Sequence, residues 1–405
     1  MANHDAQKRR VESYEELYPR CSQDDFDRRH KKLRCAMENE GLDCLLIYGG
    51  YREMYQANSF WITNYADCFQ SWTVFPLKGE PVLYNTLYPH LLYAKKVSII
   101  NKTEWGGPEI AKTVVNDIKE KGLENSTIGL VGVDSRRTVN FPQSHFGIFE
   151  KELPNVRFVD VTMMVEKLRA VKSMEEIAFV EKGADITDKC MEALVDALKP
   201  GVTDYELYAI INNVAYRLGG EPNFTLFAST SMSNPNMPYP WPKPSKRKIN
   251  NGDLVSNELC ANYMGYSGQL IRPIALGEPT KELWKLYNTA EELYHAIADA
   301  IKPGNTEQDV IEAVRPIAQK GDFHQQAPLV HGWDNKPDRP WIGLPGAAQF
   351  PITPHVFEEG QLIMIEPNPC SMDLKKGIFL GSLHVVTQNG CRCLQKFPLE
   401  FIIKN

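Results

Sequence analysis

The stretch Gly252–Leu259 reads GDLVSNEL, and the stretch Gly360–Pro367 reads GQLIMIEP. Each begins with a glycine and a polar residue, continues with a short apolar run, and carries a glutamate at the same offset. A short apolar run after a glycine turn is typical of a buried strand. Because a buried carboxylate is costly unless another group pairs with it, Glu258 and Glu366 are predicted to share one polar site.

A second pair of stretches supports an internal duplication. Leu198–Asp204 reads LKPGVTD and Ile301–Glu307 reads IKPGNTE, so both contain a helix end, a Pro-Gly stop and a threonine that can cap the next helix. Lys-Pro-Gly is a common turn, and chance is the alternative explanation. Two matches in the same order favour two copies of a helix–stop–helix–strand unit in the C-terminal half.

Composition and charge restrict the class of protein. The 405 residues favour two or three domains, and 43% hydrophobic with 24% charged residues is typical of a globular protein. A net charge of −6 gives no footprint for nucleic acid, and no apolar run approaches the ~18 residues of a membrane helix. The polar start is unlike a secretory signal, and the nine scattered cysteines indicate reduced thiols in a cytoplasmic protein.

The order of predicted elements indicates an α/β protein of two domains, 1–165 and 166–405. Residues 1–25 are predicted to form a loose polar arm. Helices are predicted at 26–40, 110–121, 173–198, 203–218, 280–301 and 306–320. Strands are predicted at 43–48, 72–76, 81–84, 127–132, 156–160, 377–386 and 391–401, besides the two glutamate strands. A proline-rich loop over 229–246 is long enough to suggest a functional role.

Several motifs together resemble the creatinase/aminopeptidase P superfamily. Arg169–Ile177 (RAVKSMEEI) resembles the opening of its catalytic domain, and Gly252–Val255, Gly265-Tyr266, His331-Gly332 and Glu366-Pro367 follow in the family's order. The resemblance covers about residues 26–400. It implies a creatinase-like N-terminal α/β domain, a C-terminal pita-bread domain with pseudo-two-fold symmetry, and a homodimer.

The metal ligands of the peptidases in this superfamily are two Asp, one His and two Glu. The resemblance places Glu258, Gln269, His331, Glu366 and about Gly381 at these positions. Glutamine is a poor ligand for a hard divalent ion, and glycine offers no side-chain ligand. No metal cofactor is therefore predicted, although Glu258, His331 and Glu366 could together hold one divalent ion. The acid/base histidine of metal-free creatinase aligns with Trp241, a further departure.

The candidate site residues follow from this alignment and from their chemistry. Glu258, His331 and Glu366 are predicted to be catalytic, with His331 transferring protons. The predicted substrate-binding residues are Tyr239, Trp241, Gln269, Arg272 and Trp333. With Trp341, the aromatic members could surround a planar or quaternary cation. The alternatives are structural glutamates satisfied by Arg272 or backbone donors, and aromatic side chains that only pack. Cys260 is predicted to be a core thiol instead of a nucleophile, since no adjacent base is evident.

The sequence thus predicts a metal-independent hydrolase, similar to creatinase and ectoine hydrolase, that cleaves a non-peptide C–N bond in a small nitrogenous molecule. The expected partner is this substrate, with no nucleic acid or membrane. One alternative is a lyase or mononuclear metalloenzyme of the same fold, similar to dimethylsulfoniopropionate lyase or Xaa-Pro dipeptidase. The other is a non-catalytic pita-bread module that binds peptides.

Overall fold

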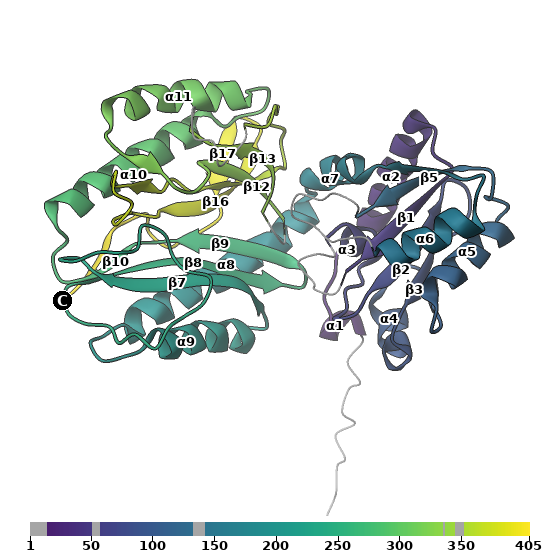
Figure 1. The fold of residues 1–405 in the computed structure, drawn as a ribbon, viewed down its shortest axis with the longest axis horizontal. Helices are drawn as coiled ribbons and strands as arrows, with labels where there is room; N and C mark the ends of the chain where they lie inside the picture. Colours follow the sequence, from purple (N-terminus) through teal and green to yellow (C-terminus); the bar gives the residue numbers. More distant parts are fainter. Residues whose placement is uncertain (1–13, 51–56, 133–141, 335–336, 345–351) are drawn as a thin grey trace, which may run out of the picture. The chain divides into compact units, whose positions relative to one another are not determined.

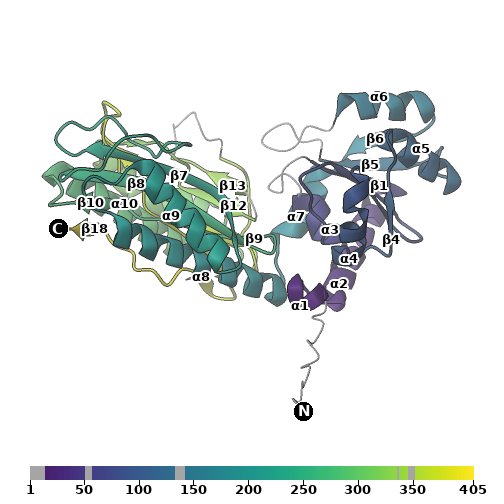
Figure 2. The same ribbon diagram turned by 90° about the horizontal axis from the view of Figure 1, so that it is seen from below.

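The computed structural model describes residues 14–50, 57–132, 142–334, 337–344 and 352–405. The chain divides into two compact units, Met1–Leu168 and Arg169–Asn405, and each is described by itself (Figures 1 and 2). Both this division and the predicted domain boundary after residue 165 fall within helix α7 (Thr162–Ala170).

A six-stranded mixed sheet forms the centre of the first unit, in the order β4-β3-β2-β1-β5-β6. The strands are β1 (Cys44–Gly49), β2 (Ser71–Pro76), β3 (Val82–Asn85), β4 (Lys102–Trp105), β5 (Thr127–Val131) and β6 (Arg157–Asp160). The other helices are α1 (Tyr14–Leu17), α2 (Gln23–Glu40), α3 (Ala57–Thr63), α4 (Leu91–Val97), α5 (Ile110–Glu120) and α6 (Gln143–Glu152).

Helices cover both faces of this sheet, which is why the central strand β1 is buried along its whole length. Leu46 packs in a core with α5 and α6, whereas Leu45 and Ile47 pack in a second core with α2, α3 and α7. This alternation follows from the two-residue period of a strand. The apolar run CLLIYG is therefore continuous because neither face of β1 meets solvent.

The start of α2 differs from the prediction. Ser22 accepts a hydrogen bond from the backbone N–H of Asp25 at 3.2 Å, so the helix begins at Gln23 rather than Phe26. The predicted arm over residues 1–25 is therefore wrong over its last part, which forms α1 and the first turn of α2. Residues 1–13 of that arm lie outside the described residues.

The second unit is built on a ten-stranded sheet with the main order β13-β12-β14-β16-β9-β8-β10-β18. In addition, β7 pairs with β8 and β17 pairs with β16. The strands are β7 (Glu221–Ser231), β8 (Asp253–Tyr263), β9 (Tyr266–Ile271), β10 (Ile274–Leu276), β12 (Val330–Trp333), β13 (Pro337–Ile342), β14 (Leu362–Ile365), β16 (Gly381–Thr387), β17 (Gly390–Cys393) and β18 (Ile402–Lys404). A separate pair is formed by β11 (His324–Gln325) and β15 (Pro369–Cys370). The helices are α8 (Met174–Ala197), α9 (Asp204–Arg217), α10 (Lys281–Ala300) and α11 (Glu307–Lys320). Within the described ranges, no helix is both long and apolar enough to cross a bilayer.

Two similar halves make up this unit, and the predicted duplication is confirmed. Helices α8 and α9 pack in one core with β7 to β10, and α10 and α11 pack in another with β12, β14 and β16 (Figure 1). Gly252 and Gly360 precede β8 and β14 with φ of +84° and +88°, a left-handed conformation that favours glycine. The predicted helix ends agree with α8 to α11 within one residue. The order of elements is the mixed α/β, pseudo-two-fold architecture that the sequence predicts.

Strand β7 is absent from the sequence-based prediction. It pairs antiparallel with β8, with Leu226 opposite Glu258, so it supports the strand that carries the first glutamate. The run FTLFA over residues 224–228 is rich in residues that favour strands and was the available signal. The proline-rich loop consequently begins after Ser231 instead of at Ser229.

The buried His384 gives the second unit a predictable pH dependence. Burial lowers the pKa of His384 from 6.5 to about 4, and its ring contacts the Tyr294 hydroxyl at 3.1 Å. Unfolding exposes a histidine that binds a proton below pH 6.5, so stability is present above that pH and is lost as pH falls toward 4. The loss is about 3 kcal/mol. His384→Gln should flatten the dependence of the urea-unfolding free energy over this range, and an unchanged slope would contradict the assignment.

Candidate active site

Two pairs of neighbouring strands in the second sheet, β8 with β9 and β12 with β14, position the predicted site residues. Glu258 lies on β8, Gln269 on β9 and His331 on β12, and Glu366 directly follows β14. Gln269 pairs with Cys260 across β8 and β9, so Glu258, two residues from Cys260, lies on the same face as Gln269. The strand order β12-β14-β16-β9-β8 then brings the glutamates of the two halves together.

A continuous chain of hydrogen bonds and an ion pair links these side chains. The Gln269 Nε2 donates to Glu258 Oε1 at 2.6 Å and to Glu366 Oε2 at 3.3 Å. The Tyr239 hydroxyl donates to Glu258 Oε2 at 3.0 Å, and His331 Nε2 lies 3.3 Å from Glu366 Oε1. Both glutamates and the histidine are at most 4% exposed. The structure thus brings Glu258, His331 and Glu366 into one cluster, with Gln269 between the two carboxyl groups.

The electrostatics of the cluster are those of crowded, buried acidic groups. Burial raises the pKa of Glu258 well above its usual range, and the charge of Glu366 adds to the increase, whereas bonds from Tyr239 and Gln269 oppose it. Burial and the same two glutamates raise the pKa of the Cys260 thiol. Cys260 therefore stays protonated, which supports the core-thiol interpretation over a nucleophile. A cation or a proton is needed to offset the two carboxylates.

The orientation of His331 leaves one ring nitrogen directed at the carboxylates. Its Nδ1 lies 2.8 Å from the Gly332 carbonyl oxygen, which can only accept, so Nδ1 carries a proton. In the neutral ring, Nε2 then has a lone pair facing Glu366, and in the imidazolium it has a proton to donate. His331 can therefore exchange a proton with Glu366 or supply a nitrogen ligand.

The aromatic side chains near the site have different surroundings. Trp333 and Trp341 are buried, with ring centroids 5.8 Å and 5.2 Å from that of His331, and the Trp333 indole donates to the Ser267 carbonyl oxygen at 2.7 Å. They pack around the histidine ring and fix its position. Trp241 is 49% exposed. Of the aromatic residues predicted to bind substrate, Tyr239 is the one bonded to a candidate catalytic group.

Arg272 does not pair with the carboxylates, contrary to the alternative in which it satisfies them. Its guanidinium donates to the carbonyl oxygens of Gly381, Pro398 and Phe397 and to the Ser382 hydroxyl. It also donates to its neighbour's carbonyl oxygen, and the side chain is 1% exposed. Arg272 therefore joins β9 to β16 and to the segment before β18, and its predicted substrate-binding role lacks a free donor to support it.

A largely buried ionic network, which the sequence did not indicate, holds the end of β12 and the start of β13. Lys172 Nζ lies 2.8 Å from Asp334 Oδ2, Arg169 pairs with the same carboxylate, and Arg169 also pairs with Asp338 at 2.6 Å. Asp334 and Asp338 are therefore paired with buried cationic side chains and are not simply solvated. Arg169 and Lys172 belong to the RAVKSMEEI motif, whose role here is to position the strands that carry His331.

The residues of the cluster do not fit a second metal ion. Gln269 directs an amide N–H at both carboxyl groups, and Gly381 has no side chain. A Cβ at Gly381 would lie 2.7 Å from the Ile365 carbonyl oxygen, 2.8 Å from the Met364 Cε and 3.1 Å from the Glu366 Cβ. The backbone is therefore closely packed around Gly381, and any larger residue there must displace the backbone beside Glu366.

Gly381→Ala is expected to destabilise the second unit by about 1–3 kcal/mol, since overpacking forces shifts in the neighbouring backbone. Glutamate at this position would meet the same contacts and would not restore a ligand. The matched control is Gly390→Ala on β17, where a Cβ would meet nothing within 4 Å. Urea-unfolding free energies measure both, and equal values for the two variants would show that Gly381 is not closely packed.

The same residues do fit one divalent ion. Two carboxylates and an imidazole nitrogen form a suitable donor set. The Gln269 Oε1 is buried without a hydrogen-bond partner in the described part of the chain, so a turn of the amide would present an oxygen where Nε2 now lies. The ligand atoms of Glu258, His331 and Glu366 do not all lie within 4.8 Å of one another. Among the described residues, Asp67, Cys68 and His90 do meet this limit.

Comparisons with known proteins support the same fold. Residues 178–388 match the Metallopeptidase family M24, and residues 29–171 match the Creatinase/Prolidase N-terminal domain. An Xaa-Pro dipeptidase of Pyrococcus furiosus is 28% identical over 344 residues, which cover 81% of this chain and 90% of that protein. The structure of a recombinant prolidase from Thermococcus sibiricus has a TM-score of 0.78 at 21% identity, covering 95% of this chain and 100% of that chain. The Xaa-Pro dipeptidase from Bacillus anthracis has a TM-score of 0.77 at 22% identity, covering 93% and 99%.

These findings correct two predictions. A metal-independent hydrolase of a non-peptide C–N bond is the wrong prediction, since the matched family model is that of Metallopeptidase family M24 and the Pyrococcus furiosus relative is an Xaa-Pro dipeptidase. The prediction that the protein needs no metal is wrong for the same reason. Both errors came from treating the departures at Gln269 and Gly381 from the expected ligand set as the loss of all metal chemistry. The resemblance itself is confirmed, and the chain belongs to the Metallopeptidase family M24, with a creatinase-type N-terminal domain.

Proposed function

We propose that this chain is a mononuclear metal-dependent peptidase that hydrolyses the C–N bond of small dipeptides, in particular those with proline in second position. The observation that carries the proposal is the buried cluster of Glu258, His331 and Glu366, with Gln269 between the two carboxyl groups. The name of the Pyrococcus furiosus relative, Xaa-Pro dipeptidase, supports the substrate class. The missing ligands at Gln269 and Gly381 support one ion instead of two.

Glu258, His331 and Glu366 are the residues that would hold the ion. Such an ion supplies Lewis-acid polarisation of the scissile carbonyl group. Burial favours the protonated form of Glu258. When this proton is lost, both carboxylate oxygens can act as ligands. Gln269 must then turn its amide, because an N–H aimed at an ion is unfavourable, and this places the unpartnered Oε1 in the cluster.

Tyr239 is the residue that can stabilise charge on the substrate. Its hydroxyl donates to Glu258 Oε2, and burial, followed by the charges of the two glutamates, raises the pKa of Tyr239 well above its usual range. The phenol therefore keeps its proton at all working pH values. A neutral hydroxyl in a site shielded from water can donate to an oxyanion as it develops during amide hydrolysis. Tyr239 packs on Phe379, with ring centroids 4.8 Å apart, which limits its movement.

The test measures dipeptide turnover by metal-depleted full-length protein after addition of Mn²⁺, Co²⁺ or Zn²⁺. An alanyl-proline dipeptide is the probe, and alanyl-alanine and creatine are the comparison substrates. We expect turnover of the proline dipeptide that requires added metal and saturates with one ion at the second unit. Turnover that is unaffected by chelator, or that requires two ions there, would overturn the proposal.

A peptide-binding module without turnover is the second candidate, and a specific observation favours it. The closed packing at Gly381 removes a ligand that a dinuclear peptidase needs. This candidate predicts that the proline dipeptide binds to the metal-loaded protein, as measured by calorimetry, and is recovered uncleaved. Glu366→Gln would then weaken binding without any turnover to lose.

A further inference from the structure

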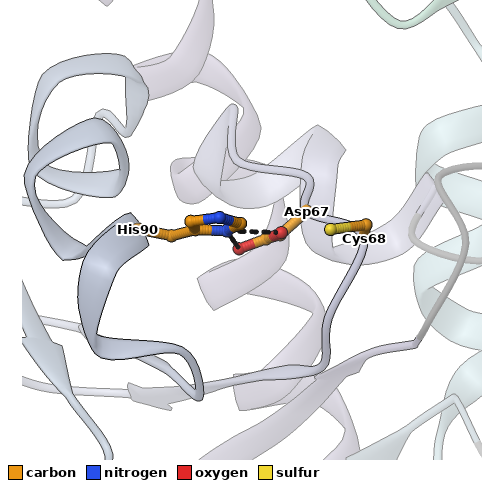
Figure 3. A group of neighbouring side chains, drawn as sticks. All are labelled: Asp67, Cys68 and His90. Atoms are coloured by element: carbon orange, nitrogen blue, oxygen red, sulfur yellow. Dashed lines mark hydrogen bonds and ion pairs between the residues drawn. The ribbon is translucent and has the colours of Figure 1, made fainter.

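Asp67, Cys68 and His90 form a compact group of potential metal ligands in the first unit (Figure 3). Asp67 and Cys68 lie in the segment between α3 and β2, and His90 ends the short 3-10 helix η2 (Tyr88–His90). One ligand atom of each side chain lies within 4.8 Å of the other two. The peptidase proposal uses none of these residues.

The Asp67 carboxylate is held in place before any ion binds. The Tyr65 hydroxyl donates to its Oδ2 at 2.5 Å, and the backbone N–H of Phe69 donates to its Oδ1 at 3.3 Å. His90 Nδ1 lies 2.9 Å and 3.0 Å from the two carboxylate oxygens. The bonds from Tyr65 and Phe69 can remain when an ion binds, and bonds of this kind fix the orientation of a ligand and are nearly as important to a metal site as the ligands.

The other two ligands are positioned by different parts of the fold. The backbone N–H of His90 donates to the Leu87 carbonyl oxygen at 3.0 Å, and α4 begins at the next residue. The His90 ring lies edge-on to the Phe69 ring, with centroids 5.9 Å apart. Cys68 is exposed, and Figure 3 shows its sulfur on the side that faces the Asp67 carboxylate. The group is therefore buried at Asp67 and open to solvent at Cys68.

We propose that Asp67, Cys68 and His90 bind one divalent ion of the Zn²⁺ class, with the fourth coordination position open to solvent. A thiolate, an imidazole nitrogen and a carboxylate oxygen are all ligands that Zn²⁺ takes in proteins. Mg²⁺ and Ca²⁺ prefer sites made of oxygen alone, so the thiol and the imidazole select against them. The exposure of Cys68 leaves room for water or another ligand at the fourth position.

Binding of the ion changes where protons lie on two of the three ligands, Cys68 and His90. The Cys68 thiol loses its proton to solvent and becomes the thiolate ligand. In the neutral His90 ring, Nδ1 carries the proton that it donates to the Asp67 carboxylate. The ring must pass this proton through solvent to Nε2 before Nδ1 can become a ligand, which leaves the number of protons on the ring unchanged. One proton is released for each ion bound. The ion joins the segment before β2 to the start of α4, so binding should raise the thermal unfolding temperature of the first unit.

Co²⁺ is the probe for this site, because a thiolate ligand gives it a near-ultraviolet charge-transfer absorption that oxygen and nitrogen ligands do not. The metal-free full-length protein is titrated with Co²⁺ under a phosphine reductant, and Zn²⁺ is then added. We expect the thiolate absorption in the wild-type chain, its loss in Cys68→Ser, and its displacement by Zn²⁺. His90→Gln should weaken Co²⁺ binding by about 10-fold or more.

Three controls separate this site from the active site. Cys35→Ser removes the other exposed cysteine, Cys260→Ser removes the thiol beside Glu258, and Glu366→Gln weakens the active-site ion. The absorption should remain in all three. Its absence from the wild-type chain, or its persistence in Cys68→Ser, would overturn the proposal. The peptidase proposal stands or fails separately, because dipeptide turnover should be unchanged in Cys68→Ser.

Discussion

Replacement of Glu366 by glutamine is expected to lower kcat/KM for a proline dipeptide by about 100-fold or more, since even the outer partners of metal ligands cost 10- to 100-fold when removed. Glu366 contacts both His331, at 3.3 Å, and the Gln269 amide, at 3.3 Å. The glutamine is nearly isosteric but replaces one carboxylate oxygen with a donor. It therefore removes charge and a ligand atom while it preserves packing. Steady-state kinetics and metal content by elemental analysis are the measurements.

The matched control for this variant is Glu359→Gln. Glu359 is exposed and lies seven positions before Glu366, ahead of the glycine turn. Its replacement makes the same chemical change at the surface and should leave kcat/KM and metal content unchanged. Equal activity in Glu366→Gln and the control would show that the cluster is not the active site. The expected result is a folded Glu366→Gln protein with reduced metal content and strongly lowered kcat/KM.

The largest effect on stability is expected for Arg272→Met, which should lower the free energy of unfolding by about 3–5 kcal/mol. Methionine fills much of the volume but cannot donate. The carbonyl oxygens of Gly381, Pro398 and Phe397 and the Ser382 hydroxyl all lose a charged donor in a buried site. Urea unfolding followed by tryptophan fluorescence measures the loss.

Arg392→Met is the control for the arginine itself. Arg392 pairs with Glu181 at 2.6 Å, but both side chains are about half exposed, so its replacement should cost less than about 1 kcal/mol. Arg272→Lys should fall between the two variants, because an ammonium group cannot reach all of these oxygens at once. If Arg272→Met lowers the free energy of unfolding by less than about 1 kcal/mol, the hydrogen bonds of Arg272 do not hold β9 and β16 together.

The repeated stretches determined the architecture of the second unit. Gly252–Leu259 and Gly360–Pro367 predicted two glutamate strands from two related halves, and the left-handed glycines, strands and helix pairs are all present. Local patterns suffice here, because helix caps and glycine turns act within a few residues. Strand β7 was missed although Gly219-Gly220 directly precede it and its run FTLFA favours a strand.

The site could be predicted only in part. Glu258 and Glu366 were singled out because a carboxylate in an apolar run demands a partner, and His331 was singled out by the resemblance to the superfamily. The roles of Arg272, Asp334 and Asp338 were not predicted, because each depends on residues far away in the chain. Asp334 pairs with Lys172 across 162 positions, and Arg272 with Pro398 across 126. Such pairs leave no local pattern.

By itself, therefore, the sequence determined the two α/β units and the duplicated half-units, and it pointed to the carboxylates and the histidine that the structure brings into one cluster. Only the tertiary structure decided that Gln269 lies between the two glutamates and that the backbone has closed around Gly381. It also decided that Asp67, Cys68 and His90 meet in the first unit. The physical reason is that a shared site is a property of strand order and register, which bring together side chains that the chain separates.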